Sequence, residues 1–333
     1  MRVLDCVSGG GGKLSGTASG EVFTINTASD SSLNIPRADL ESQSTVTNTK
    51  SSPGCRLCWR LCIDVPIVVL VLGLVGLYEA RVIPSYKAGF FCNDPALSYP
   101  FKGDTVTAEV LIPSLLIGPL VFIFVTELFI KSDYTFRGRL KRSLQGTAWV
   151  YRCFLYGLVF NFVLVELIKG ISGRGRPSFF DVCKPDTALT CNGTEWVSTF
   201  ECTAEWSSSY RQFDSYHSFP SGHTSLSVHA GFFVAWYLQR RAFSWKNTSF
   251  FLVPFLQLCC MVYAAVCSLS RITDNQHHWW DVLVGAVIGV ATMCYSAFVL
   301  LNNLKTKSSE DCRNSRKSNL PKCLIDDSRF ATA

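Results

Sequence analysis

Six long stretches with almost no charged side chains are the feature that most constrains how this chain can fold. A helix needs about 20 apolar residues to cross the hydrocarbon core of a bilayer. The stretches cover residues 58–78, 107–130, 148–168, 224–239, 250–269 and 282–302. The fourth is short and contains His229. The pattern predicts an all-α integral membrane protein built as a bundle of six transmembrane helices.

The regions outside these stretches have a different composition. Residues 1–55 are rich in Ser, Thr, Asn and Gly and contain few large apolar side chains. Such a segment buries too little surface to offset its ordering entropy, so we expect a disordered cytoplasmic segment. It shows no basic region followed by a short apolar run, which would mark a cleavable signal peptide. We expect a six-span domain over 56–304 and a polar cytoplasmic tail over 305–333.

Lysine and arginine gather on one set of flanks, and this asymmetry predicts the orientation. The positive-inside rule makes these flanks cytoplasmic and, with six spans, both termini as well. The outer face then carries residues 79–106, 169–223 and 270–281. The basic flanking residues are Arg56, Arg60, Lys131, Arg137, Arg139, Lys141, Arg142, Arg240, Arg241, Lys246, Lys305 and Lys307. The formal net charge of +6 is too small and too dispersed for a nucleic-acid-binding protein.

Two sequons and four cysteines bear on this topology. Asn192 starts an Asn-Gly-Thr sequon in the long outer segment, and we expect it to be glycosylated. Asn247 starts a second sequon, but it falls on the cytoplasmic side and should stay unmodified. An oxidising outer compartment allows disulfides among the outer cysteines, and the sequence leaves all three pairings open. These cysteines are Cys92, Cys183, Cys191 and Cys202.

The first stretch with chemical character is KGISGRGRP, residues 169–177, directly after the third span. Arginine forks match phosphate oxygens in a bidentate manner, and a lysine adds a compact positive charge. Lys169, Arg174 and Arg176 therefore suit an anion. A plain basic juxtamembrane loop is an equally good interpretation of this stretch alone. Its position on the outer side, where positive charge is disfavoured, favours a functional role.

The second stretch is FPSGHTSLS, residues 219–227, which leads into the fourth span. Ser221 is placed to cap a helix, so the amides near Gly222 and His223 would lie at the positive end of the helix dipole. Such a helix start binds anions readily, and His223 could give a proton to a bound group. The simpler interpretation is an ordinary helix start with an incidental histidine.

The third stretch is SRITDNQHHWWD, residues 270–281, before the sixth span. Arg271 offers another phosphate fork. His277 and Asp281 lie four positions apart, on one face if the segment is helical. A carboxylate that fixes one imidazole nitrogen leaves the other free to attack, so we expect His277 to be a nucleophile. His278 would be turned away and serve as a neighbouring polar or interfacial group.

The predicted topology brings all three stretches to one side of the membrane. The third span ends there, the fourth begins there, and the fifth and sixth turn around there. The combination predicts a site for a phosphorylated group at the outer membrane surface. Three acids within spans have a different expected role. Asp64, Glu127 and Glu166 lie near Arg60, Lys131 and Lys169 respectively, and we expect them to pair with these residues or to snorkel rather than to take part in chemistry.

The three stretches resemble the signature of the type 2 phosphatidic acid phosphatase superfamily. Its pattern is K-x6-R-P, then P-S-G-H, then S-R-x5-H-x3-D, and every spacing is present here. Within that superfamily, residues 58–304 are most similar to the six-span lipid phosphate phosphatases of animals, including the outer stretch GFFCNDPALSYP at residues 89–100. The two termini resemble nothing that helps to interpret them.

This resemblance implies a role for each matching residue. His277 would be the nucleophile that forms a phosphohistidine, Asp281 would orient it, and His223 would protonate the departing alcohol and then activate water. The phosphate cradle would consist of Lys169, Arg176, Ser221, Gly222 and Arg271. The family implies no metal and no other cofactor, because arginines, a lysine and a helix start supply the positive charge that phosphoryl transfer needs.

The leading function is thus hydrolysis of phosphatidate, lysophosphatidate, sphingosine 1-phosphate or ceramide 1-phosphate at the outer leaflet. Two alternatives stay open: a non-catalytic membrane scaffold that binds lipid phosphates, and a sphingolipid head-group phosphotransferase. Expected partners are the lipid substrates and the bilayer, with no nucleic acid, and a homo-oligomer is compatible with the sequence. We expect the plasma membrane, with internal membranes as the alternative, because no address signal is evident.

Overall fold

The computed structural model describes residues 53–80, 82–130, 135–242 and 250–301. The described residues from Leu57 onward form one compact unit. The long helices in chain order are α1 (Pro53–Glu79), α2 (Ala108–Ile130), α3 (Phe136–Ser172), α6 (Gly222–Arg241), α7 (Leu252–Thr273) and α8 (Trp279–Cys294), and α8 continues into the π-helical segment η3 (Tyr295–Leu300). The fold is mostly helical, as expected.

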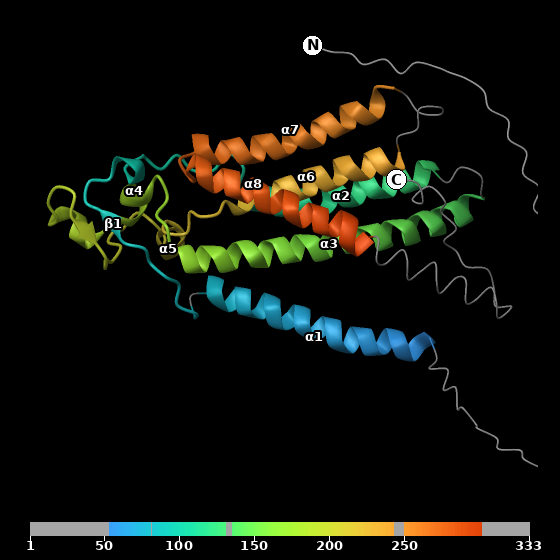
Figure 1. Ribbon diagram of the computed structural model, residues 1–333, viewed down its shortest axis with the longest axis horizontal. Helices are drawn as coiled ribbons and strands as arrows, with labels where there is room; N and C mark the ends of the chain where they lie inside the picture. Colours follow the sequence, from blue (N-terminus) through green and yellow to red (C-terminus); the bar gives the residue numbers. More distant parts are fainter. Residues whose placement is uncertain (1–52, 81, 131–134, 243–249, 302–333) are drawn as a thin grey trace, which may run out of the picture. The chain divides into compact units, whose positions relative to one another are not determined.

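Helix α6 lies at the centre of the bundle. It contacts α2, α3, α7 and α8, and these helices run side by side (Figure 1). Its neighbours bury most of its side chains, including Phe233 and Tyr237. The neighbours themselves expose many large apolar side chains, for example Phe129 and Phe255. A helix covered by other helices can carry serine, threonine and histidine without placing them against lipid.

Four helices of the described residues are long and apolar enough to cross a membrane. They are Ala108–Ile130, Phe136–Ser172, Leu252–Thr273 and Trp279–Leu300. They match the second, third, fifth and sixth expected spans, so the chain has the character of a multi-pass membrane protein. The first and fourth expected spans, 58–78 and 224–239, do form helices. The described apolar part of α1 is short, Val65–Tyr78, and α6 is more polar because it lies inside the bundle.

Two helix boundaries differ from the expected spans and matter for the site. Helix α3 begins at Phe136, so it includes the basic residues expected to flank the membrane, and it ends at Ser172. Gly173 follows in a left-handed conformation with φ of 53°, which favours glycine and lets the chain leave the helix. Helix α7 extends to Thr273 and so includes Arg271, which the sequence placed between spans.

A close approach between α8 and α6 brings the second and third sequence stretches together. A Cβ atom added at Gly285 would lie 2.6 Å from the carbonyl oxygen of Ser221, so only glycine fits this contact. The amide of Ser221 in turn donates to the carbonyl oxygen of Asp281 at 3.1 Å. The start of α6 is therefore fixed directly against the first turn of α8.

Short elements between the long helices gather at the end of the bundle where α3 finishes and α6 begins (Figure 1). They are β1 (Phe90–Phe91), η1 (Pro95–Leu97), α4 (Phe179–Cys183), η2 (Asp186–Leu189), β2 (Trp196–Val197) and α5 (Ser209–Asp214). Strands β1 and β2 pair antiparallel. Two disulfides, Cys92–Cys191 and Cys183–Cys202, select one of the three pairings that the sequence left open.

The opposite end of α6 is held by a buried ion pair. Arg241 donates to the two carboxylate oxygens of Glu127 at 2.9 and 3.2 Å, and the Tyr237 hydroxyl donates to the same carboxylate at 2.8 Å. Glu127 thus binds partners from α6, whereas its expected partner Lys131 lies outside the described residues. Glu166 does pair with Lys169, at 2.8 Å, as the sequence predicted.

Candidate active site

The three sequence stretches converge at one end of the helix bundle. Lys169 Nζ lies 3.6 Å from the position that a Cβ atom would take at Gly222. Arg176 donates through Nη1 to Oε1 of Gln276 at 2.6 Å, which joins the first stretch to the third. His277 contacts Ser218, just before the second stretch. Residues more than 100 positions apart in the sequence therefore share one site.

The imidazole of His277 is buried, and its shortest hydrogen bond is to a backbone carbonyl. Its Nδ1 lies 2.7 Å from the carbonyl oxygen of Ser218. A carbonyl only accepts, so Nδ1 carries the proton and Nε2 keeps its lone pair. Burial, and then the positive charges of Arg176 and Lys169, lower the pKa of His277 well below 6.5. The imidazole is therefore neutral at physiological pH, the form in which Nε2 is a nucleophile.

Asp281 acts on His277 less directly than the sequence suggested. Helix α8 begins at Trp279, so His277 precedes the helix and does not share a helical face with Asp281. The distance from His277 Nδ1 to Asp281 Oδ2 is 3.9 Å, too long for a hydrogen bond. The carboxylate instead accepts from the Ser218 hydroxyl at 2.5 Å and from the His278 amide at 3.0 Å. Its negative charge still lies next to the imidazole.

His278 has a structural role that its position in sequence did not indicate. It is the residue that caps α8, and its Nδ1 lies 3.2 Å from Asp281 Oδ2. Its ring stacks on Trp280, with 4.7 Å between the ring centroids, and the Arg174 guanidinium lies over the same indole at 5.0 Å. These contacts join the first sequence stretch to the start of α8 and leave His277 as the histidine available for chemistry.

The start of α6 presents the second histidine. Ser221 caps the helix by accepting from the amide of Thr224 at 3.5 Å, as expected. Gly222 and His223 then occupy the first turn, where helix amides have no partner within the helix. The Nε2 atom of His223 is buried without a hydrogen-bond partner. Arg271, Lys169 and Arg176 all lie near enough to act on this ring electrostatically. A buried unpaired nitrogen beside three cations suits an anionic ligand.

Carboxylates hold in place the two arginines predicted for the phosphate cradle. Arg176 donates to Asp214 Oδ1 at 2.6 Å. Arg271 is only 1% exposed, and it donates to Asp104 at 2.7 Å and to Asp274 at 3.0 Å. Its Nε atom is buried with no partner and remains available as a donor. Fixed guanidinium groups need little reorganisation to bind an anion, and this favours electrostatic stabilisation of a reacting phosphate.

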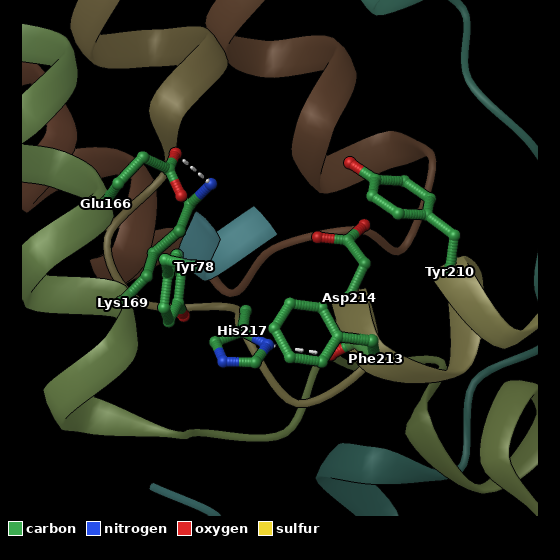
Figure 2. A pocket seen from close by; sticks show the side chains of 7 residues that line it. All are labelled: Tyr78, Glu166, Lys169, Tyr210, Phe213, Asp214 and His217. Atoms are coloured by element: carbon green, nitrogen blue, oxygen red, sulfur yellow. Dashed lines mark hydrogen bonds and ion pairs between the residues drawn. The ribbon is translucent and has the colours of Figure 1, made fainter. Parts of the chain in front are cut away.

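Lys169, which lies next to Gly222 at the start of α6, also lines a small pocket (Figure 2). Figure 2 shows Glu166 and Lys169 on one side of the pocket and Asp214 and Tyr210 on the other. The residues that line it are Tyr78, Glu166, Lys169, Tyr210, Phe213, Asp214 and His217. His217, which precedes the second stretch by two residues, belongs to this lining.

Several positioning residues escaped the sequence analysis. Ser218 contributes both its carbonyl, to His277, and its hydroxyl, to Asp281. Gln276 accepts from Arg176 and donates to the carbonyl oxygen of Gly103 at 3.2 Å. Asp214 lies outside all three stretches. The only available signal was proximity in sequence, because Ser218 and Gln276 each stand next to or near a motif residue, and polar residues in loops have many other roles.

The glycosylation candidate lies apart from this cluster. Asn192 is exposed and directly follows Cys191, which the disulfide to Cys92 anchors. An exposed asparagine on an anchored loop is accessible to modification. The second sequon, at Asn247, lies outside the described residues.

Comparisons with known proteins agree with the motif geometry. The family model described as PAP2 superfamily matches residues 150–305, which include all three stretches. Phospholipid phosphatase 2 of Rattus norvegicus is 30% identical over 261 residues, 76% of this chain and 90% of that protein. Phospholipid phosphatase 2 of Homo sapiens is 31% identical over 69% of this chain and 80% of its own length.

A relative from an insect is equally similar. The protein named putative phosphatidate phosphatase of Drosophila melanogaster is 31% identical over 74% of this chain and 69% of its own length. No solved structure gives a significant match. The three motifs, their convergence at one end of a helical bundle and these relatives together establish that the chain belongs to the PAP2 superfamily.

Proposed function

We propose that this protein hydrolyses lipid phosphate monoesters through a phosphohistidine at His277. The observation that carries the proposal is the state of His277: Nδ1 donates to the Ser218 carbonyl, and Nε2 keeps its lone pair in a site where the charges of Arg176 and Lys169 act on the ring. The relatives named for phospholipid and phosphatidate phosphatase activity support the substrate class. Substrates of this class are phosphatidate, lysophosphatidate, sphingosine 1-phosphate and ceramide 1-phosphate.

In the first step, His277 Nε2 attacks phosphorus and the bond from phosphorus to the ester oxygen breaks. Burial and the charges of Arg271, Lys169 and Arg176 lower the pKa of His223 to about 3 in the free site, and the bound phosphate offsets those charges so that the ring takes up a proton from solvent. The departing lipid alkoxide takes this proton from His223, which acts as the general acid. The new phosphohistidine ring carries positive charge, because Nδ1 keeps its proton and donates it in the hydrogen bond to the Ser218 carbonyl. The carboxylate of Asp281, 3.9 Å from Nδ1, stabilises that charge without receiving the proton.

In the second step, His223 is neutral and takes a proton from water, whose oxygen attacks the phosphohistidine. The bond between phosphorus and His277 Nε2 breaks, inorganic phosphate leaves, and both histidines return to their starting states. Lys169, Arg176, Arg271 and the amides at the start of α6, near Ser221 and Gly222, stabilise charge on the phosphoryl oxygens in both steps. Neither step uses a metal ion or another cofactor.

The site would lie where substrate lipids present their phosphates. We place it at the outer leaflet of the plasma membrane, with six spans and both termini in the cytoplasm. The distribution of basic residues and the exposed sequon at Asn192 support this orientation. A phosphate at the surface with its tail in the bilayer would approach the cradle from the membrane side.

The direct test is release of inorganic phosphate from phosphatidate in mixed micelles containing EDTA. We expect the wild type to be active and His277→Ala to lose at least about 1000-fold in kcat, because the nucleophile is gone. Alcohols added as competing acceptors should not divert the phosphoryl group. Phosphate transfer to those alcohols would indicate a phosphotransferase, and a well-folded wild type that binds lipid phosphates but releases none would indicate a scaffold.

A further inference from the structure

The pocket beside Lys169 adjoins the phosphate cradle but differs from it in chemical character. Lys169 lines the pocket and also lies next to Gly222 at the start of α6, so the two compartments share this side chain. The cradle presents cationic groups. The pocket presents two carboxylates, an imidazole and three aromatic rings in addition to Lys169 (Figure 2). Lys169 pairs with Glu166 at 2.8 Å, which compensates its charge.

Asp214 has an oxygen that is not used in the described part of the chain. Its Oδ1 accepts from Arg176 at 2.6 Å, whereas no described group donates to Oδ2. The side chain is 33% exposed, so Oδ2 can accept from a ligand in the pocket. The hydrogen bond from Arg176 to Oδ1 restricts rotation of the carboxylate, so Oδ2 keeps a fixed position.

His217 adds a second acceptor. It is 2% exposed, and its Nδ1 lies 2.7 Å from the carbonyl oxygen of Phe213, so Nδ1 carries the proton. Its Nε2 is buried with no hydrogen-bond partner. Burial lowers the pKa of His217 to about 4, which keeps the ring neutral and Nε2 an acceptor. A buried polar atom without a partner commonly marks a place where a ligand or water binds.

We propose that this pocket binds a primary ammonium group carried by the substrate close to its phosphate. The inference rests on the proposed function, because it places the phosphate of the same molecule in the cradle. Asp214 would accept a charge-assisted hydrogen bond from the ammonium group. Tyr78, Tyr210 and Phe213 contribute aromatic side chains to the lining around the cation. The preferred substrates are then zwitterionic amino-lipid phosphates.

A hydroxyl group would fit this pocket less well than an ammonium group. A hydroxyl has one proton to donate, whereas a primary ammonium has three and also carries the charge that a carboxylate and aromatic faces attract. The opposite character of the two compartments matches the two charges of a zwitterionic head group. A substrate with phosphate alone would use only the cradle.

The test compares three substrates of equal chain length in the same mixed micelles: a long-chain 2-aminoalkyl phosphate, the 2-hydroxyalkyl phosphate and the unsubstituted alkyl phosphate. We expect the wild-type kcat/KM to be about tenfold higher for the amine than for the unsubstituted compound, with the hydroxyl compound between them. The ratio of amine to unsubstituted kcat/KM is the selectivity to be followed.

Two substitutions should lower that ratio toward one. Asp214→Asn keeps an oxygen for Arg176 but removes the negative charge, and Tyr210→Leu removes an aromatic face from a side chain that is 56% exposed. Tyr99→Leu is the matched control, since Tyr99 is 51% exposed and does not line the pocket. The control should keep the wild-type ratio.

The outcomes separate this inference from the proposed function. If the wild type hydrolyses all three compounds at equal kcat/KM, or if both pocket variants keep the wild-type ratio, the ammonium site is wrong and the phosphatase proposal stands. If the wild type releases phosphate from none of them, the proposed function itself fails. A wild-type preference for the amine that falls in both pocket variants and persists in Tyr99→Leu supports the site.

Discussion

The two ends of helix α6 both bury charged groups, but they do so in different ways. At its C-terminal end, Arg241 binds Glu127 through two hydrogen bonds and Tyr237 donates to the same carboxylate. At its N-terminal end, Nε2 of His223 and Nε of Arg271 are buried without partners. The first arrangement pairs a carboxylate with a guanidinium and ties α6 to α2. The second gathers three cations around an unpartnered imidazole nitrogen and suits an added anion. Buried charges therefore indicate a functional site here where several cations surround a buried histidine nitrogen that has no partner.

The largest effect should come from breaking the ion pair at the C-terminal end. Glu127→Gln removes the buried negative charge that Arg241 and Tyr237 bind, which should lower the free energy of unfolding by about 3–5 kcal/mol. Thermal unfolding in detergent measures this loss, with Glu109→Gln in the exposed first turn of α2 as the control. The folded fraction should still turn over substrate. Stability equal to the control would show that the ion pair does not fix α6.

The next largest effect concerns the cradle. Arg271→Gln should lower kcat/KM for phosphatidate by about 100- to 1000-fold, as expected when one positioned donor to a developing charge is removed. Arg240→Gln, at the opposite and exposed end of α6, is the matched control and should retain full activity. Phosphate release measures both variants. Equal losses in the two would mean that charge in general, rather than the cradle, supports activity.

Asp281→Asn should have a smaller effect on catalysis than in enzymes where the acid alone fixes the histidine tautomer. The Ser218 carbonyl continues to accept from His277 Nδ1, so the tautomer persists and only the nearby charge is lost. We expect retained folding and a decrease of about 10- to 100-fold in kcat. Near-normal turnover would contradict any role for Asp281, and a loss above about 10⁴-fold would show that it controls the tautomer.

The pH dependence tests the environment of His277. Because its pKa lies well below 6.5, the ring stays neutral as the pH falls through 6.5, and the acidic decline of kcat should begin below that value. Arg176→Gln removes one of the charges that lower this pKa, so the decline should move to higher pH. Comparing the two proteins on one substrate cancels the ionisation of the substrate. If kcat declined at the same pH in the wild type and in Arg176→Gln, the decline would not reflect the ionisation of His277.

Loss of glycosylation should have the smallest effect on activity but a clear effect on the electrophoretic mobility of the protein. Asn192→Gln should remove an electrophoretic shift and leave phosphate release unchanged, because Asn192 is exposed and does not belong to the site. Asn247→Gln should change nothing if residue 247 faces the cytoplasm. A shift lost on Asn247→Gln and kept on Asn192→Gln would invert the proposed orientation.

Sequence patterns predicted the parts of this molecule that depend on local order. The spacing of apolar stretches located the helices, and the motif spacings located Lys169, Arg176, His223, Arg271 and His277. The partners of these residues depend on tertiary packing and could not be read from spacing. The fourth expected span forms α6 inside the bundle, and this helix is not among the four described helices that are long and apolar enough to cross a membrane. Asp214 and Ser218 reach the site only because loops fold back onto it.

The contact between His277 and Asp281 is a second case in which residue spacing did not predict the partner of a side chain. The four-residue spacing suggested a shared helical face, but helix α8 starts two residues after His277, so the spacing does not place the two side chains together. A backbone carbonyl, which any residue type supplies, binds the imidazole instead. Contacts made by the backbone carry no residue signature, and a single sequence cannot reveal them.

The most direct test of the account is to identify the phosphorylated residue. His223→Ala is incubated with an aryl phosphate whose leaving group needs no acid, quenched at alkaline pH and analysed by mass spectrometry. The phosphohistidine should form and persist, because the variant lacks the group that activates water, and the phosphate should lie on His277. Phosphate on another residue, or turnover without any phosphorylated enzyme, would contradict the assignment of His277 as the nucleophile.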